Sequence, residues 1–265
     1  MISPLAHIHP NAKIGSNVEV GPFAIIEENV TISDDCHIMP HAVIMKGTRL
    51  GKGCKVFPGA VLGAIPQDLK FDGEETTVEV GDNTTIRECV TINRGTIDKW
   101  KTVVGSDCLL MAYCHIAHDC ILGDHVIIAN SVQLAGHVEI GDYAFVGGMA
   151  AAIQFSKVGA HTYIAGGTEI IKDIPPYIKA GRSPLSYVGV NSIGLQRRGF
   201  SPEKINSIHE IYRNIYMRGM NTSQAMDYIE ENLPDTDEKR EILEFIKNSK
   251  RGILKISSKE IVDEN

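Results

Sequence analysis

Apolar residues recur at every sixth position along the first two thirds of the chain. Stepping by six from Ile8 to Ile170 gives 28 positions, and all but three of them carry an aliphatic side chain. Neither a helix, with its period of 3.6 residues, nor an alternating strand, with its period of two, repeats at six. A fixed short period of this kind is typical of a solenoid, in which each repeat packs on the next. The three exceptions are Asp68, Glu74 and Asp98.

Two further positions in each hexad are occupied by small residues. The fourth residue after the aliphatic position is usually small, as at Ala24 and Ala42, and glycine often follows the aliphatic residue directly, as at Gly21 and Gly141. Such glycines suit a tight corner between short strands. Val- and Ile-rich strands that bend every six residues describe a parallel β-helix. The pattern resembles the hexapeptide-repeat family, whose members wind as left-handed triangular prisms with three hexads in each coil.

Three hexads to a coil would place residues 18 apart above one another, at about the 4.8 Å spacing of neighbouring strands. The repeat breaks over residues 64–79 and 95–103, and resumes in the same six-residue phase each time. We therefore expect two loops that leave a continuous prism, and such loops are where binding groups tend to lie. The prism is expected to end in "KDIPPY", because Pro175 and Pro176 cannot donate to a strand ladder.

The predicted fold is an all-β solenoid followed by a small α-helical C-terminal domain. We expect the left-handed parallel β-helix over residues 1–178, and a connector with the helical domain over residues 179–265. The second part is indicated by helix start signals rather than by hexads. Three helices are expected there: one with Ser201 as its N-cap and Pro202 at its first position, one from near Thr222, and one through residues 237–254.

The composition is that of an ordinary globular protein rather than of a disordered chain. The 265 residues are 43% hydrophobic and 22% charged. No apolar run is long enough to cross a bilayer. The N-terminal segment lacks the basic and apolar regions of a secretory signal. We therefore expect a cytoplasmic protein without stable membrane insertion.

The net charge of −7 is unevenly distributed along the chain. Residues 172–218 carry eight basic side chains against three acidic ones. This stretch could meet an acidic protein or a phosphate, although a solvated basic face explains it equally well; no nucleic-acid partner is expected. Five of the six cysteines take the small inward position of their hexads, which favours buried packing over a zinc site or disulfides: Cys36, Cys54, Cys108, Cys114 and Cys120.

The segment "HIAHDC" holds the candidate chemistry, since His115, His118 and Asp119 lie within it. Ile116 is an inward position, so His118 and Asp119 lie off it, and His115 belongs to the preceding strand. The 18-residue rule places Gly136 and then Gln154 above His118, and His137 above Asp119.

A histidine beside a glycine backbone suits acyl transfer. The His118 imidazole can take a proton near neutral pH, and the Gly136 N–H can receive a developing oxyanion. Asp119 could hold the imidazole tautomer. Two histidines on a β-helix are, taken alone, more often structural than catalytic.

Five segments together change that balance. "PQDLKF", "HIAHDC", "AGH" (135–137), "DIPPY" and "GVNSIGLQRRGF" (189–200) occur in this order along the chain. At their spacings they closely resemble the UDP-N-acetylglucosamine 3-O-acyltransferases, which catalyse the first step of lipid A biosynthesis. The resemblance covers nearly the whole chain, and the loop motifs and "QRRGF" are more specific than the hexads.

The resemblance implies a homotrimer with active sites in clefts between neighbouring prisms. It implies transfer of a (3-hydroxy)acyl group from an acyl carrier protein thioester to the 3-hydroxyl of UDP-N-acetylglucosamine. No metal and no cofactor would be required, because a thioester is already activated and positioning suffices. The resemblance implies that His118 is the general base and that the Gly136 N–H is the oxyanion donor. Asp68 and Lys70 would contact the sugar and its surroundings, His137 and Gln154 would line the cleft, and His115 would support the site. The residues that would contact the nucleotide and its phosphates are Asn191, Arg197 and Arg198.

The resemblance also implies a ruler for the acyl chain. Gly148 and Gly166 are 18 apart and should stack, which would leave a strip of prism wall without side chains. The family position matching Gly166 limits the length of the hydrocarbon chain. Both glycines could instead simply form corners.

Two positions depart from the family pattern. Ile153 stands where many relatives have histidine, and Ile193 stands where many have glutamate. Neither change affects the expected base. They leave open details of the acceptor pocket, including whether the acceptor is the ordinary sugar nucleotide or its 3-amino analogue.

Two other functions are compatible with a hexapeptide prism. A zinc hydratase, like the γ-class carbonic anhydrases, would need three converging imidazoles and an open position for water. Those relatives use a His-x4-His spacing, which "HIAHDC" lacks. A non-catalytic scaffold is the other alternative, and it predicts that replacing His118 changes no activity.

Overall fold

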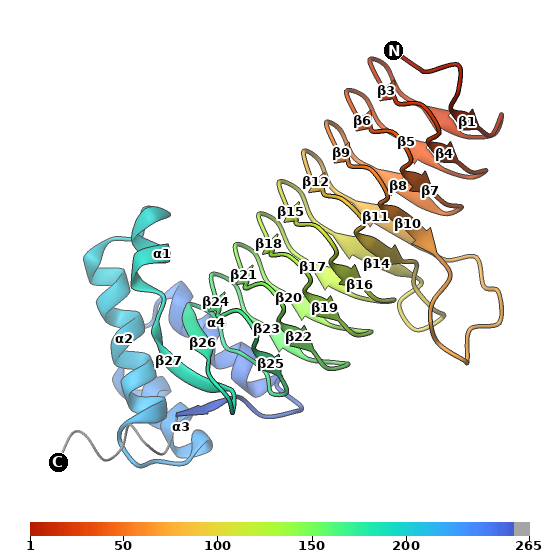
Figure 1. Cartoon of the computed structure of the whole chain (residues 1–265). Helices are drawn as coiled ribbons and strands as arrows, with labels where there is room; N and C mark the ends of the chain where they lie inside the picture. Colours follow the sequence, from red (N-terminus) through yellow and green to blue (C-terminus); the bar gives the residue numbers. More distant parts are fainter. Residues whose placement is uncertain (257–265) are drawn as a thin grey trace.

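The computed structural model of the chain describes residues 1–256. They form a long prism of three parallel β-sheets, with helices gathered beyond the C-terminal end of the prism (Figure 1). From β1 to β22, each strand pairs with the third strand that follows it, so three strands make one coil. His7 pairs with Ile25, and Ile127 pairs with Phe145. Both pairs are 18 residues apart, which confirms the predicted coil length.

The three sheets run the length of the prism. The first consists of β1 (His7–Ile8), β4 (Ile25–Ile26), β7 (Val43–Ile44), β10 (Val61–Ala64), β13 (Thr91–Asn93), β16 (His115–Ile116), β19 (Gln133–Leu134), β22 (Ala151–Ala152) and β25 (Glu169–Ile170). The second consists of β2 (Lys13–Ile14), β5 (Thr31–Ile32), β8 (Thr48–Leu50), β11 (Thr77–Val80), β14 (Lys101–Val104), β17 (Ile121–Leu122), β20 (Glu139–Ile140) and β23 (Lys157–Val158). The third consists of β3 (Glu19–Val20), β6 (His37–Ile38), β9 (Lys55–Val56), β12 (Thr85–Ile86), β15 (Leu109–Leu110), β18 (Ile127–Ile128), β21 (Phe145–Val146), β24 (Tyr163–Ile164), β26 (Ile178–Gly181), β27 (Ser186–Val190) and β28 (Lys255–Ile256).

The six-residue repeat builds the core of the prism. The second residue of most two-residue strands is the hexad aliphatic, and it points inward; Ile44, Ile92 and Ile116 are fully buried. Burying one such side chain stabilises the fold by about 1.5–3 kcal/mol. The five cysteines at inward positions are buried as predicted, and only Cys89 is exposed. Burial raises the pKa of the Cys108 thiol to about 11, so it is unsuited to thiolate chemistry.

Two loops interrupt the prism by whole numbers of hexads. Val61 pairs with Thr91, 30 positions later, so the first loop adds 12 residues to one coil. Thr91 pairs with His115, 24 positions later, so the second loop adds six. The first loop leaves β10 and returns at β11, and the second leaves β13 and returns at β14. The three polar positions in the six-residue repeat, Asp68, Glu74 and Asp98, therefore lie in the loops and not in the core.

The strands are joined by three columns of turns. We name corner 1 the turns after the first sheet (117–120, 135–138 and 153–156), corner 2 those after the second (123–126, 141–144 and 159–162), and corner 3 those after the third (111–114, 129–132, 147–150 and 165–168). One residue in most turns has a positive φ, including Asp119 at 60° and His137 at 62°. Asn, Asp and His tolerate this left-handed conformation better than most other non-glycine residues.

The sheet continues past the expected end of the prism. β26 pairs in parallel with β24, after the turn that contains Pro175 and Pro176, and β27 returns antiparallel to β26. The predicted domain boundary between residues 178 and 179 therefore lies inside β26. Tyr212 is fully buried, and its hydroxyl donates a hydrogen bond to the Pro176 carbonyl at 2.5 Å. This bond connects the helices to the prism.

Four helices follow in the described residues, where three were predicted. The additional one is α1 (Ser192–Arg197), in a segment that had been assigned to a connector. As predicted, Ser201 caps α2 (Pro202–Tyr216), and its side chain accepts from the Lys204 N–H. The remaining helices are α3 (Thr222–Asn232) and α4 (Asp237–Lys247).

The last helix ends earlier than predicted. It stops at Lys247, because the chain from residue 252 returns to the prism: Ile253 bridges to Asp173, and β28 pairs with β27. A continuous helix to residue 254 could not make these strand contacts. No helix among residues 1–256 is long and apolar enough to cross a membrane.

Candidate active site

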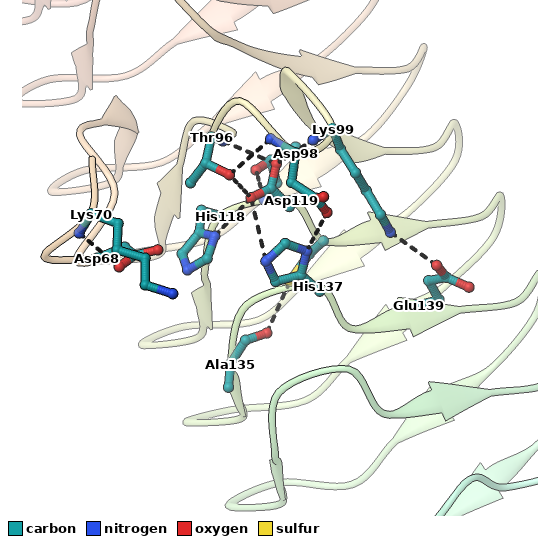
Figure 2. Close-up of polar contacts among 12 residues, drawn as sticks. Asp68, Lys70, Thr96, Asp98, Lys99, His118, Asp119, Ala135, His137 and Glu139 are labelled. Atoms are coloured by element: carbon teal, nitrogen blue, oxygen red, sulfur yellow. Dashed lines mark hydrogen bonds and ion pairs between the residues drawn. The ribbon is translucent and has the colours of Figure 1, made fainter. Parts of the chain in front are cut away.

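Corner 1 gathers most of the predicted site residues. Because strands of one parallel sheet end at the same edge, whatever follows β10, β13, β16, β19 and β22 meets along one line. The structure places there, in this order, the first loop with Asp68 and Lys70, the second loop, His118 with Asp119, Gly136 with His137, and Gln154. Figure 2 shows the side chains of Asp68, Lys70, His118, Asp119 and His137.

His118 and Asp119 form a buried hydrogen-bonded pair. Nδ1 of His118 lies 2.8 Å from Oδ2 of Asp119. His118 is 6% exposed and Asp119 is 0% exposed. A carboxylate at this position accepts the Nδ1–H, which leaves the Nε2 lone pair of the neutral imidazole available as a base.

The second loop saturates the Asp119 carboxylate with donors. Oδ1 accepts from the backbone N–H groups of Thr96 at 3.0 Å and Lys99 at 3.3 Å, and Oδ2 accepts from the Thr96 hydroxyl at 2.7 Å. Burial raises the pKa of Asp119, but the hydrogen bonds from His118 and Thr96 outweigh it, and the pKa lies below its usual range. Asp119 therefore remains an anion beside His118.

Gly136 lies directly against the His118 ring, as the 18-residue rule predicted. A Cβ added at Gly136 would lie 2.6 Å from both Cε1 and Nε2 of His118. Only glycine allows this approach without displacing the imidazole. The Gly136 N–H has no acceptor among residues 1–256, so it is available to a ligand.

His137 packs beside the pair as predicted, above Asp119. Its Nε2 lies 3.7 Å from Oδ2 of Asp119, and its ring meets that of His118 edge-on with centroids 5.1 Å apart. The other face stacks on Phe155 at 4.4 Å. Burial lowers the pKa of His137, so the imidazole is neutral near pH 7.

His115 lies outside this cluster. It occupies β16, and its Nδ1 hydrogen-bonds to the Thr91 hydroxyl at 2.7 Å. Burial lowers the pKa of His115, and the charge of His118 lowers it further. The two histidines of "HIAHDC" are thus electrostatically coupled, and only His118 has the carboxylate partner.

Asp68, Lys70 and Gln154 lie at the rim of the corner. Oδ1 of Asp68 accepts from the Lys70 backbone N–H at 3.0 Å, and the first loop is anchored where Asn93 donates to the Ile65 carbonyl at 3.0 Å. The Lys70 ammonium extends from this loop (Figure 2). Gln154 is exposed, and its backbone carbonyl accepts from the Arg251 guanidinium at 2.6 Å.

The expected nucleotide contacts lie at corner 2, away from His118. Asn191 caps α1 and donates to the His161 carbonyl at 2.9 Å. Arg198 donates to the Tyr143 carbonyl at 2.8 Å and covers the Tyr143 ring at 5.4 Å. Arg197 is exposed. One chain therefore does not bring these three residues together with His118.

Gly166 lies at a third place, corner 3. A Cβ added there would lie 3.0 Å from the Gly148 carbonyl oxygen, so the two glycines stack as predicted. Gly148 and Gly166 both have ordinary negative φ values, unlike Gly167 at 67°. The backbone conformation therefore does not require glycine at either position.

Three groups of corner 1 could in principle hold a metal ion. Potential ligand atoms of His118, Asp119 and His137 lie within 4.8 Å of one another. The chemistry of the donor set favours hydrogen bonding instead, because both Asp119 oxygens already accept hydrogen bonds from Thr96 and Lys99. A zinc site of the hydratase type would also need a third converging imidazole.

Sequence reasoning missed the residues that hold the pair in place. Thr96, Lys99 and Thr102 all contact Asp119, and Thr102 does so by accepting its backbone N–H at 2.8 Å. The only signal in the sequence was the break in the hexads, which indicated a loop and not its conformation.

The fold and this corner define a class of protein, the hexapeptide-repeat acyltransferases. The family described as bacterial transferase hexapeptide (six repeats) matches residues 29–64 and 101–136. The family described as UDP N-acetylglucosamine O-acyltransferase, domain 2, matches residues 173–254. The chain belongs to the acyl-[acyl-carrier-protein]–UDP-N-acetylglucosamine O-acyltransferases.

Proteins similar in sequence align with almost the whole chain. The O-acyltransferase of Myxococcus xanthus is 48% identical over 255 residues, with 96% of this chain and 99% of that protein covered. That of Xylella fastidiosa is 41% identical over 257 residues, with 96% and 98% covered.

The solved UDP-N-acetylglucosamine acyltransferases agree. That of Bacteroides fragilis superposes with a TM-score of 0.95 at 54% identity, covering 96% of this chain and all of that one. That of Francisella novicida superposes with a TM-score of 0.96 at 36% identity, covering 100% and 97%. These matches confirm the left-handed β-helix with a helical C-terminal part.

Proposed function

We propose that this chain transfers a (3-hydroxy)acyl group from an acyl carrier protein thioester to the 3-hydroxyl of UDP-N-acetylglucosamine, the first step of lipid A biosynthesis. The names of its relatives support the reaction. The observation that carries it is the buried His118–Asp119 pair, at 2.8 Å, beside the Gly136 N–H, for which residues 1–256 offer no acceptor. A general base and an oxyanion donor are the two groups that acyl transfer from a thioester needs.

The pair supplies the proton transfers. Asp119 holds Nδ1–H, so Nε2 of His118 removes the proton from the sugar hydroxyl as that oxygen attacks the thioester carbonyl. The carbonyl oxygen becomes an oxyanion and accepts a hydrogen bond from the Gly136 N–H. Collapse of the intermediate breaks the carbon–sulfur bond, and His118 returns the proton to the leaving thiolate. The ester and the free thiol of the carrier are the products.

The surrounding residues bind the acceptor. Asp68 and Lys70, from the first loop, contact the sugar and its surroundings. His137 and Gln154 line the same corner. His115, on β16, has a supporting role near the site. With Ile153 and Ile193 in place of polar family residues, the choice between the ordinary acceptor and its 3-amino analogue is a matter for assay.

The active form is a homotrimer in which each site combines two chains. His118 lies at corner 1, whereas Arg198 lies at corner 2 and Gly166 at corner 3. A ring of three prisms sets different corners of adjacent copies against each other, which is a closed heterologous arrangement. Sites between copies would then unite the groups that one chain keeps apart.

Subunit mixing tests this arrangement. Co-expressed His118→Ala and Arg197→Ala/Arg198→Ala chains are each inactive as homotrimers. In a closed ring of three, every trimer that contains both variants has one intact site out of three, so purified mixed trimers are expected to recover about one third of the wild-type activity. No recovery in mixed trimers, separated by two affinity tags, would contradict a shared site.

The acidic carrier protein docks on basic side chains near the site, and the enzyme works in the cytoplasm. Of the basic residues at 172–218, Lys204 is already paired with Glu238, and Arg213 and Arg218 are both paired with Glu210. These ion pairs reduce the charge offered by α2 and leave exposed Arg197 as the stronger candidate contact.

An assay with defined substrates tests the function. The protein is incubated with UDP-N-acetylglucosamine, or its 3-amino analogue, and a panel of acyl carrier protein thioesters. The proposal expects an ester or an amide product and free carrier thiol in equal amounts. Absence of product with every donor, or equal use of coenzyme A thioesters, would overturn it.

A further inference from the structure

The second loop makes three hydrogen bonds to the carboxylate of Asp119. The loop adds six residues to the coil immediately before the one that holds His118. It brings two backbone N–H groups and one hydroxyl to the carboxylate (Figure 2). Those contacts are with the residue that orients the base, and not with the base itself.

Thr96 makes the contact that bears on His118. Its hydroxyl donates to Oδ2 of Asp119 at 2.7 Å, the same oxygen that accepts from Nδ1 of His118 at 2.8 Å. Its backbone N–H binds Oδ1 at 3.0 Å. The two bonds from one residue to both carboxylate oxygens fix the plane of the carboxylate, and so fix the direction of the lone pair that meets His118.

The orientation of the Thr96 hydroxyl is itself determined. Its oxygen accepts from the Asp98 backbone N–H at 3.3 Å. With one lone pair occupied in this way, the hydroxyl proton is directed at Oδ2 of Asp119, 2.7 Å away. Thr96 is 8% exposed, so water does not replace this donor readily.

We propose that Thr96 is a positioning residue for the catalytic pair: its hydroxyl holds Asp119 so that His118 keeps its proton on Nδ1 and its lone pair on Nε2. This inference rests on the proposed function of His118. It assigns a purpose to the second loop, which contributes to the reaction through its contacts with Asp119.

Anchoring of the loop does not account for the hydroxyl. The backbone N–H groups of Thr96 and Lys99 bind Oδ1 with or without the threonine side chain. Thr102 accepts the Asp119 N–H from the far end of the loop at 2.8 Å. A valine at position 96 keeps the shape of threonine and these backbone bonds to Asp119, and removes the donor to Oδ2 together with the acceptor of the Asp98 N–H.

The test compares Thr96→Val with Thr96→Ser, which restores the hydroxyl. The matched control is Thr162→Val, because Thr162 is also buried, lies at corner 2, and has no hydrogen-bond partner for its hydroxyl among residues 1–256. We expect Thr96→Val to lower kcat about 10- to 100-fold, with KM for both substrates changed less than about twofold, since small misplacements of a catalytic group cost rate. Thr96→Ser recovers most of the rate, and Thr162→Val stays near wild type.

Ring ¹⁵N chemical shifts of His118 provide the readout that a structural role would not move. In wild type they should report a single tautomer protonated on Nδ1, and in Thr96→Val a mixture. Equal kcat for Thr96→Val and Thr162→Val, no rescue by serine, or an unchanged tautomer would overturn the inference while leaving the acyltransferase assignment intact. A wild-type protein without transfer activity would instead refute the proposed function.

Discussion

Nδ1 of His118 lies 2.8 Å from Oδ2 of Asp119, although the two residues are neighbours in the chain. Adjacent side chains in extended backbone point to opposite sides. Asp119 escapes this alternation because its φ is 60°, at the left-handed position of a prism corner. The corner geometry of the β-helix therefore creates the pair, and the second loop completes it by binding the carboxylate.

Asp119→Asn should cost most of the activity while leaving the fold intact. The amide can donate to Nδ1 and so favour the tautomer that carries its proton on Nε2, where the base is needed. We expect kcat to fall about 10²-fold or more, with KM for UDP-N-acetylglucosamine nearly unchanged. Steady-state kinetics measure both.

The matched control for that variant is Asp107→Asn. Asp107 also has a positive φ and lies 4.0 Å from Nδ1 of a histidine, His125, but at corner 2. It should keep wild-type kinetics. An Asp119→Asn enzyme as active as this control would remove Asp119 from the mechanism.

The lowered pKa of Asp119 gives stability a defined pH dependence. The carboxylate is more acidic in the folded state than its unfolded value of about 3.9. Its stabilisation is therefore fully present above that value and is lost as the pH falls through the folded pKa. The free energy of unfolding of wild type should exceed that of Asp119→Asn most near pH 7, and the gap should narrow below about pH 4. Urea unfolding at both pH values measures it, and a gap that widens in acid would contradict the pKa direction.

Gly136→Ala should inactivate the enzyme through a side chain and not through the backbone. The new Cβ would lie 2.6 Å from the His118 ring, which must swing away, while the N–H at 136 is retained. A displacement of this size costs about 10²-fold in rate.

Gly141→Ala provides the contrast for Gly136→Ala. There the new Cβ would lie 2.5 Å from the backbone nitrogen of Ala160, which cannot move aside. Gly141→Ala should therefore lower the melting temperature and keep the specific activity. Gly136→Ala should keep the melting temperature and lose the activity. Retention of more than half of the rate in Gly136→Ala would contradict the close packing at His118.

Gly166→Met should shorten the preferred acyl chain. The side chain would enter the strip of wall that Gly148 and Gly166 leave bare, with its Cβ 3.0 Å from the Gly148 carbonyl oxygen. Each methylene kept out of an apolar site costs about 0.8 kcal/mol, so long donors lose more than medium ones. Competition between donors of different length measures the shift. Equal loss on every chain length would mean that Gly166 serves the fold.

The hexad pattern was sufficient to predict the prism and most of corner 1. Because one coil has 18 residues, the stacking of Gly136 on His118 and of His137 on Asp119 followed from counting. Asp68, Glu74 and Asp98 also occupy every-sixth positions, although they lie outside the core. They do so because each loop adds a whole number of hexads to the coil.

Counting could not supply contacts made by residues outside the repeat. Thr96 and Lys99 reach Asp119 through the conformation of a loop, which has no period. The short helix α1 was missed because its six residues give little signal. The end of the last helix at Lys247 depends on tertiary pairing of Ile253 with Asp173, which local propensity does not contain.

The most direct test of the account is the rate of acyl transfer by His118→Ala beside His125→Ala. His125 is also a corner histidine, at corner 2, where it stacks on Tyr143. Both variants should fold and elute as wild type does. The account predicts that the rate of His118→Ala is about 10²- to 10⁴-fold lower than that of wild type, and that the rate of His125→Ala is close to wild type. A His118→Ala enzyme that keeps more than about a tenth of the wild-type rate would show that His118 is not the base.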